Sequence, residues 1–328
     1  MKMFCAICLL CVLSASCEYK DLCYDHNHWA NVRIVFDWQH APEAMTKATT
    51  ETTGAGMTVL FYDDETATSQ EPVRYDLPGR EGGNVRLLPG TYQALSYNYD
   101  TETILYRGME LENTLEAYTR LSSIGEGTMM SRTDMPRANN TEQEPVILEP
   151  DPLWAATSET FTVNIGDESR TVTMQPQTRV CEITITIHNV PNLQYSSQFG
   201  GALSGLAPSV WMASGQIGEG TATQAFSASA IDQNTLEMHF RTFGHCPRRG
   251  EGITNPHILT IYAILADGSK WYYTYDVSQQ MHNPKQNPDD HHVYIELDDL
   301  PVPKPIVNGS GFQPTIDGWQ GVEIEVDM

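Results

Sequence analysis

Two short clusters of aspartate and histidine are the residues in this chain best suited to chemistry. They comprise Asp25, His26, Asn27 and His28, and then Asp289, Asp290, His291 and His292. In an extended segment the two histidines of the first cluster project to the same side, and imidazole is a common ligand of transition metals. However, both clusters lie in polar segments next to the start of an apolar alternating run. We therefore expect solvated segments there, with no metal site and no cofactor.

The chain lacks the local motifs that identify common catalytic centres. It contains no HExxH helix motif, no GxSxG turn and no Walker sequence. Carboxylates are abundant, but their spacing marks no pair for acid–base hydrolysis of glycosides. The adjacent basic residues Arg248 and Arg249 fit a surface charge, with a protease-sensitive loop as the alternative. We therefore predict a protein without catalytic residues.

The charge balance excludes one class of partner. The formal net charge is −23 at pH 7, from 42 acidic and 19 basic residues. Nucleic-acid binding needs a basic footprint, so we expect no nucleic-acid partner.

The first 17 residues have the organisation of an export signal. Lys2 supplies a positive charge, residues 4–13 are apolar, and small residues 14–16 precede Cys17. The apolar run is shorter than the roughly 20 residues that span a bilayer. Cys17 after small residues resembles the lipobox of bacterial lipoproteins, although Leu13 lies four residues before the cysteine rather than three. The resemblance implies cleavage after residue 16 and acylation of Cys17.

A lipid on Cys17 would tether the protein to the outer membrane without spanning it. More than one acyl chain is needed for stable anchoring, at ~0.8 kcal/mol for each buried methylene. Acidic residues follow at Glu18 and Asp21, which resembles the surface-export signal of Bacteroidetes lipoproteins. We therefore expect a lipid-anchored protein exposed at the cell surface, with residues 17–28 as a tether.

Three cysteines remain beyond the signal and the lipidation site: Cys23, Cys181 and Cys246. An odd number allows at most one internal disulfide. A Cys181–Cys246 bond and buried thiols are both open.

Alternation with a period of two dominates the rest of the sequence. Such runs, which put one side-chain set in a core and the other in water, cover residues 32–38, 57–61, 181–188, 236–241, 293–297 and 322–326. Residues 258–265 are apolar on both faces and predict a central strand. Asp267 and Gly268 then predict a hairpin turn into residues 271–275.

Other elements are fewer. We predict one amphipathic helix over Met109–Leu121, and a short helix over Asp276–Met281 with Asp276 as its N-cap and Pro284 as its stop. Residues 131–152 predict a long loop, residues 41–56 a mobile segment, and residues 301–314 an extended one. Pro89–Gly90 predicts a type II turn with positive φ at Gly90. Tyr92, Leu95 and Tyr97, just after it, fit core or sheet-surface positions better than a glycan platform.

Strands of this kind pack as antiparallel sandwiches. The length remaining after residue 16 suggests two domains. We expect an all-β chain with two tandem sandwich domains, residues 29–176 and 177–328.

Four phrases resemble the fimbrillin-associated lipoproteins of Bacteroidales. They are MTVLFYDD (57–64) with VRLLPGTYQALSYN (85–98), the strand from Arg179 to His188, WYYTYDVSQQMHNP (271–284) with HHVYIELDDLPVPKPI (291–306), and GFQPTIDGWQGVEIEV (311–326). The resemblance implies Greek-key, transthyretin-like sandwiches. It also implies an anchor or minor subunit in fimbria assembly and adhesion, which binds other fimbrillin-like subunits by β-strand addition.

A surface glycan-binding lipoprotein of a nutrient-uptake system is the alternative. Trp211, Trp271 and Trp319 coplanar on one open face would favour it. Buried tryptophans and an open sheet edge would favour assembly. Residues 320–326 predict a last strand, which either completes its own domain or lies at an edge for a partner.

Overall fold

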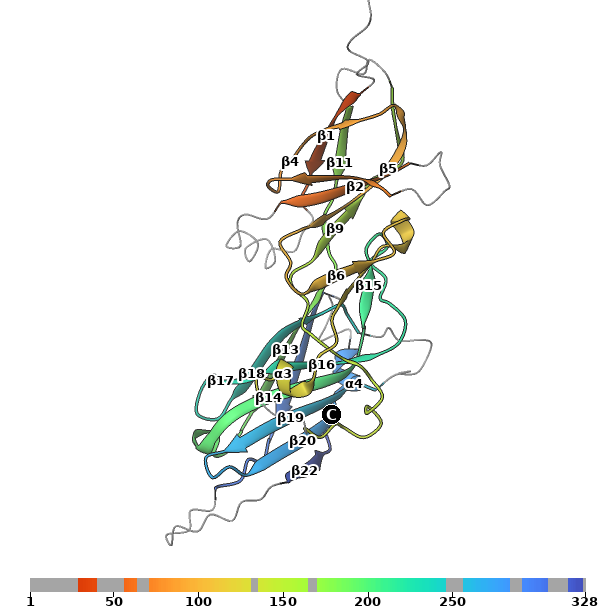
Figure 1. The fold of residues 1–328 in the computed structure, drawn as a ribbon. Coiled ribbons are helices and arrows are strands. Elements are labelled where there is room, and N and C mark those ends of the chain that lie inside the picture. Colours follow the sequence, from red (N-terminus) through yellow and green to blue (C-terminus); the bar gives the residue numbers. More distant parts are fainter. Residues whose placement is uncertain are drawn as a thin grey trace, which may run out of the picture.

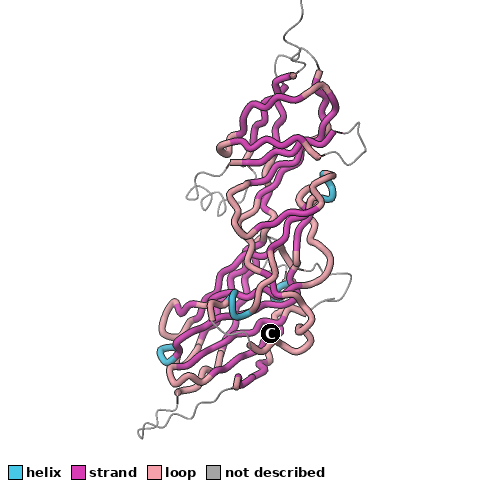
Figure 2. The backbone as a smooth tube through the Cα atoms, in the orientation of Figure 1, coloured by secondary structure: helices cyan, strands magenta, loops and turns pink. Residues whose placement is uncertain are grey.

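The computed structural model describes residues 29–39, 56–63, 71–130, 135–164, 170–245, 256–283, 291–305 and 318–326. Strands dominate these residues (Figure 2), which confirms the prediction of an all-β chain. The helical elements described are single turns: η1 (Glu112–Thr114), α3 (Ile124–Gly127), η2 (Leu193–Tyr195) and α4 (Ser278–Met281). Within the described ranges no helix is long and apolar enough to cross a membrane.

The first sandwich lies in the upper part of Figure 1. One sheet has the order β11-β1-β4 and the other the order β12-β9-β5-β2-β3, with β10 also paired to β5. The bounds are β1 (Ala30–Phe36), β2 (Met57–Asp63), β3 (Val73–Leu77), β4 (Gly82–Leu87), β5 (Gly90–Asn98), β9 (Trp154–Thr157), β10 (Phe161–Val163), β11 (Arg170–Met174) and β12 (Gln177–Thr178).

The alternation of β1 works as predicted, because Val32, Ile34 and Phe36 are buried in the core between the two sheets. The alternation of β2 does not. Six of its seven residues are buried, since Val59 faces that core while Leu60 packs into a second cluster below the sheet. The expectation of a water-exposed face on β2 is therefore wrong.

A small sheet of order β15-β7-β6 lies between the sandwiches. It consists of β6 (Ile104–Arg107), β7 (Glu116–Thr119) and β15 (Ser209–Trp211). The predicted helix over Met109–Leu121 is thus wrong, because that segment forms η1 and β7. Pairing on both sides of β7, with β6 and β15, stabilises the strand over the local helical pattern.

The second sandwich packs a sheet of order β17-β18-β13-β21 against one of order β22-β20-β19-β14-β16-β8. The strands are β8 (Val146–Ile147), β13 (Cys181–His188), β14 (Ser196–Leu206), β16 (Ala222–Ser227), β17 (Ser229–Ala230), β18 (Leu236–Thr242), β19 (Ile258–Leu265), β20 (Lys270–Asp276), β21 (His292–Asp298) and β22 (Trp319–Ile324). Isoleucines of β13 alternate into the core between these sheets. The predicted central strand and hairpin are confirmed as β19 and β20.

The two sandwiches repeat one arrangement. In each, one strand of the smaller sheet lies between an antiparallel neighbour and a parallel partner from later in the chain: β1 between β4 and β11, and β13 between β18 and β21. Most pairings in the described residues are antiparallel, and β8–β16 and β20–β22 are parallel as well.

Elements that precede residue 176 pair with strands that follow it. Strand β7 pairs with β15, and β8 pairs with β16. Helix α3 lies on β16, where a Cβ on Gly127 would come 2.6 Å from the Ala225 Cβ. Much of the stretch from Ile104 to Ile147 therefore packs on strands that follow residue 176. The domain division at that residue remains a prediction.

Two local predictions need correction. Gly90 does not have positive φ; it begins β5, and a Cβ there would contact the Tyr92 ring at 3.3 Å. Asp276 precedes the N-cap of α4, which is Val277, but its Oδ1 still accepts from the Ser278 N–H at 3.0 Å.

Cys181 is buried at the start of β13, and Cys246 lies outside the described residues, so their disulfide is untested. The loop predicted over residues 131–152 contains the short strand β8, and most of residues 41–56 and 301–314 lie outside the description.

Candidate functional site

Most residues singled out from the sequence lie outside the described ranges. These are Cys17, the cluster from Asp25 to His28, Asp289 and Asp290, and Arg248 and Arg249. His291 and His292 are described, and His292 begins β21. The lipidation at Cys17 therefore remains a prediction.

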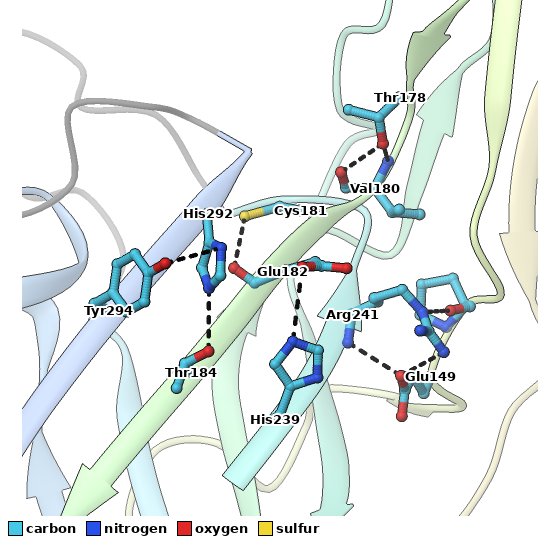
Figure 3. Close-up of polar contacts among 11 residues, drawn as sticks. Glu149, Thr178, Val180, Cys181, Glu182, Thr184, His239, Arg241, His292 and Tyr294 are labelled. Carbon is cyan, nitrogen blue, oxygen red and sulfur yellow. Dashed lines mark hydrogen bonds and ion pairs between the residues drawn. The ribbon is translucent and has the colours of Figure 1, made fainter. Parts of the chain in front are cut away.

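The outward face of β13, β18 and β21 carries a row of polar side chains (Figure 3). Because inward positions hold the core, Glu182, Thr184, His239, His292 and Tyr294 share the opposite face. The His239 Nε2 lies 3.7 Å from a Glu182 carboxylate oxygen. The His292 Nε2 lies 3.1 Å from Thr184 Oγ1, and the Tyr294 ring stacks on the His292 ring at 4.1 Å.

The contact between Glu182 and His239 shifts the pKa of each residue. Hydrogen bonding to Glu182 raises the pKa of His239, and hydrogen bonding to His239 lowers the pKa of Glu182. The His239 side chain is about half exposed (48%), so solvent weakens the pair. A general base needs a substrate position within hydrogen-bond reach, and this row lies on an open sheet face. The arrangement fits a surface network better than a catalytic dyad.

A second polar contact joins the segment before β9 to β18. Glu149 accepts from the Arg241 guanidinium at 2.9 Å and from the Arg241 backbone N–H at 3.2 Å, and Arg241 also donates to the Pro150 carbonyl (Figure 3). Burial raises the pKa of Glu149, and Arg241 opposes that shift. This contact fixes the connecting segment on the second sandwich.

The sheet edges of the second sandwich differ in how they are covered. At β21, the Gln280 side chain donates to the Glu296 carbonyl at 2.8 Å and accepts from its N–H at 2.9 Å. At the far end of the six-stranded sheet, Ile147 of β8 forms a bridge with Leu121. The opposite end of that sheet is β22, whose pairing among the described residues is with β20.

Strand β22 is an edge strand whose apolar side chains are only partly buried. Val322 and Ile324 pack against the core only in part, while Glu323 and Glu325 are exposed. Beside it lies an open hollow of about 490 Å³, lined by Asp276, Gln280 and the end of the tail at Val326 among others. An edge of this kind presents backbone N–H and C=O groups that can pair with another chain.

The tryptophans do not form a shared platform. Trp271 packs against the core of the second sandwich, whereas Trp319 packs edge-on against Tyr262 on the other face of the same sheet. Trp211 belongs to the small sheet with β7. Tyr92, Leu95 and Tyr97 are buried, which confirms that they are core residues.

The Glu182–His239 and Glu149–Arg241 contacts were not found from the sequence. Glu182 and His239 are polar positions of predicted strands, but their approach depends on the β13–β18 register. A pattern within one strand carries no information on register with a distant strand.

The chain is similar to several known proteins. A relative described as "Putative fimbrium anchoring subunit Fim4B" of Bacteroides ovatus is 23% identical over 350 residues, covering 97% of this chain and 95% of its own. The solved structure of a "putative adhesin" from Bacteroides ovatus has a TM-score of 0.56 at 22% identity, covering 83% of this chain and 94% of that one. The fimbrial anchor protein Mfa2 from Porphyromonas gingivalis has a TM-score of 0.48 at 12% identity, covering 82% and 90%.

A family model covers the larger part of the chain. It matches residues 16–227, from the residue before Cys17 through the strands of the first sandwich, the small sheet and on to β16. The matched region thus includes both sides of the predicted boundary at residue 176. The chain belongs to the DUF5119 family, whose description is a domain of unknown function.

Proposed function

We propose that this protein is a non-enzymatic surface lipoprotein that acts as an anchor or accessory subunit of a fimbria. The observation that carries the proposal is the end-to-end similarity to the Bacteroides ovatus relative whose name is that of a fimbrium anchoring subunit, across 95% of that protein. The shared architecture with a solved adhesin-like chain supports the same class.

The tether is the lipid on Cys17. Acyl chains at this position would hold the chain on the outer membrane, with residues 17–28 as spacer before β1. The sandwiches would then stand at the cell surface, where a fimbria assembles.

The partner is a fimbrial subunit that adds a strand at the β22 edge. Strand addition gives affinity through main-chain hydrogen bonds and specificity through alternate side chains. Strand β22 fits this role because it pairs with β20 along one side, which leaves its other side for an added strand. At β21, by contrast, the Gln280 side chain already hydrogen-bonds to the main chain.

The tether is tested by fatty-acid labelling in a bacterium whose own copy carries Cys17→Ala. Cys23→Ala is the matched control, since it removes a neighbouring cysteine that the proposal gives no lipid. We expect the first variant to lose label and to release fimbriae into the medium, and the control to keep both. Unchanged labelling of the Cys17 variant would refute the lipid anchor.

The partner edge is tested by a photo-crosslinking amino acid at Glu323 on β22. The control position is Glu296 on β21, which is also exposed but whose main chain Gln280 already pairs. We expect a crosslink to a fimbrial subunit from position 323 and not from position 296. Equal crosslinking from both, or none from 323, contradicts this choice of edge.

A further inference from the structure

Three histidines converge at one end of the second sandwich. His245 follows β18, His257 precedes β19, and His282 caps the C-terminus of α4. Their ligand nitrogens all lie within 4.8 Å of one another. His257 is fully buried, and the other two are half-buried.

The β19–β20 hairpin explains why two of them meet. Its ladder ends at the Ile258–Asp276 pair, and the Val277 N–H then donates to the His257 carbonyl at 2.9 Å. Ser278 Oγ accepts from the His257 N–H at 2.8 Å and donates to the Asp276 carboxylate. Helix α4 therefore starts beside His257, and its single turn brings His282 back over the imidazole.

The third histidine arrives from the neighbouring sheet. His245 forms a bridge with Leu206 at the end of β14, next to the Ala207 N–H that donates to the Gly244 carbonyl. On β14, Gly205 has a φ of +75°, and its lack of a side chain leaves room for His257. A Cβ there would come 2.6 Å from the Pro256 carbonyl oxygen and 2.8 Å from His257 Nδ1.

Hydrogen bonding sets the orientation of His257. Its Nδ1 lies 3.1 Å from the Ser204 carbonyl oxygen, which can only accept, so Nδ1 carries the proton. The lone pair is then on Nε2, which faces the His282 Nε2 at 3.1 Å. An N–H held by a backbone carbonyl is the usual orienting contact of a metal-binding histidine.

The shortest of these distances matches a shared ion: His257 Nε2 and His282 Nε2 are 3.1 Å apart, and a ligand nitrogen of His245 lies within 4.8 Å of both rings' ligand nitrogens. At the 2.0–2.1 Å bond lengths of zinc–imidazole, two ligands of a tetrahedral ion are about 3.3 Å apart. A hydrogen bond between two rings would account for the 3.1 Å contact alone, but not for the convergence of the third imidazole.

We propose that His245, His257 and His282 bind one divalent transition-metal ion of the zinc class. Imidazole nitrogens select such ions over Mg²⁺ and Ca²⁺, which prefer oxygen ligands. The ion joins the end of β18, the open end of the β19–β20 hairpin and α4. The three histidines leave the fourth position of a tetrahedral ion to water, and the ion would tie three segments that are 12 and 25 residues apart in the sequence. This site departs from the sequence-based expectation of no metal.

The test uses full-length protein purified in detergent, stripped with a chelator and titrated with Zn²⁺ by calorimetry. The variants are His245→Ala and His282→Ala, and the control is His188→Ala, an exposed histidine at the end of β13. We expect one Zn²⁺ per chain in the wild type and the control. Each ligand variant should raise the Kd by more than the roughly 10- to 100-fold that loss of an orienting partner costs.

A second measurement needs no variant. Co²⁺ added to the stripped wild-type protein should give the visible d–d absorption of a four-coordinate ion with nitrogen ligands, and Zn²⁺ should displace it. Far-UV circular dichroism confirms that each variant is folded before titration. Absence of stoichiometric Zn²⁺ binding by the wild type, or equal affinity in folded ligand variants and the control, overturns the proposal.

Discussion

Gly321 lies opposite Tyr272 in the parallel β20–β22 ladder, and the Tyr272 ring occupies the space where a side chain on Gly321 would begin. The last strand thus docks on its sheet through a position that tolerates no Cβ unless the ring moves. Gly318, three residues earlier, has open space around it.

Gly321→Val should therefore release β22. Overpacking of this kind costs about 1–3 kcal/mol, so we expect faster amide hydrogen exchange in β22 and along the β20 edge, with the remaining strands unchanged. Gly318→Val is the matched control, and its exchange should equal that of the wild type. Identical exchange in the two variants would show that the ring moves aside without cost.

A buried guanidinium holds the junction below the first sandwich. Arg179 donates to the Met212 carbonyl at 2.9 Å, to the Thr178 carbonyl at 3.3 Å and to the Ala213 carbonyl at 3.4 Å, and burial lowers its pKa to about 10. Arg179→Met removes these charged hydrogen bonds and should lower the free energy of unfolding in urea by about 2 kcal/mol. Arg179→Lys should fall between, since one ammonium cannot reproduce the planar fork. A methionine variant as stable as the wild type would contradict this role.

Glu116 is a carboxylate buried in the small sheet, where Arg107 donates at 2.6 and 2.8 Å and Ser209 donates as well. The bond from Arg107, and then that from Ser209, hold the pKa of Glu116 below its ordinary 4.5 against the effect of burial. Its stabilisation is therefore present above pH 4.5 and is lost as the pH falls through the lowered value.

Arg107→Met should cost about 2 kcal/mol at pH 7, because it leaves the carboxylate buried without its cation. Adding Glu116→Gln should restore part of the lost free energy of unfolding. In a profile of stability against pH, both Arg107→Met and the double variant should lose the wild type's fall in stability on the acid side. A profile of Arg107→Met parallel to that of the wild type would contradict the assignment.

The Glu182–His239 pair should act in a narrow pH window. The raised pKa of His239 gives stability that is present below pH 6.5 and is lost as the pH rises through the raised value. The lowered pKa of Glu182 gives stability that is present above pH 4.5 and is lost as the pH falls through the lowered value. A double-mutant cycle of Glu182→Gln and His239→Gln should give a coupling of about 0.5 kcal/mol at pH 5.5 in low salt, and none at pH 8.5. An equal coupling at both values would exclude His239 as the titrating partner.

Alternation in the sequence correctly predicted several strands of which one face meets one core. In β13, β18 and β21 the apolar residues recur every second position, and each of these strands separates the sandwich core from solvent. β2 departs from this rule since it separates two cores, and so alternation in its sequence does not report exposure. Residues 116–119 form a strand because of partners at residues 104–107 and 209–211, and local propensity cannot register such distant pairing.

The sequence did not predict the histidine cluster, because the cluster also depends on contacts between segments that are apart in the sequence. The clusters that the sequence analysis considered as metal ligands were neighbours in sequence, as at His26 and His28, whereas the three histidines that meet are 12 and 25 residues apart. Short zinc motifs place ligands within one turn or loop. Here a hairpin, a β-bulge near Gly205 and a one-turn helix bring the ligands together, and these are properties of the folded sheet.

The parallel pairing of β1 with β11 and of β13 with β21 has a mechanical consequence. In the second sandwich, a force applied between the start of β13 and the end of β21 acts at opposite ends of a ladder that runs from Glu182–His292 to His188–Asp298. The same geometry holds for β1 and β11. Force along such a ladder loads its hydrogen bonds in shear, all together, rather than opening them one after another as in a hairpin pulled from its free ends. Each of these two ladders therefore resists tension that is applied between the start of its earlier strand and the end of its later strand.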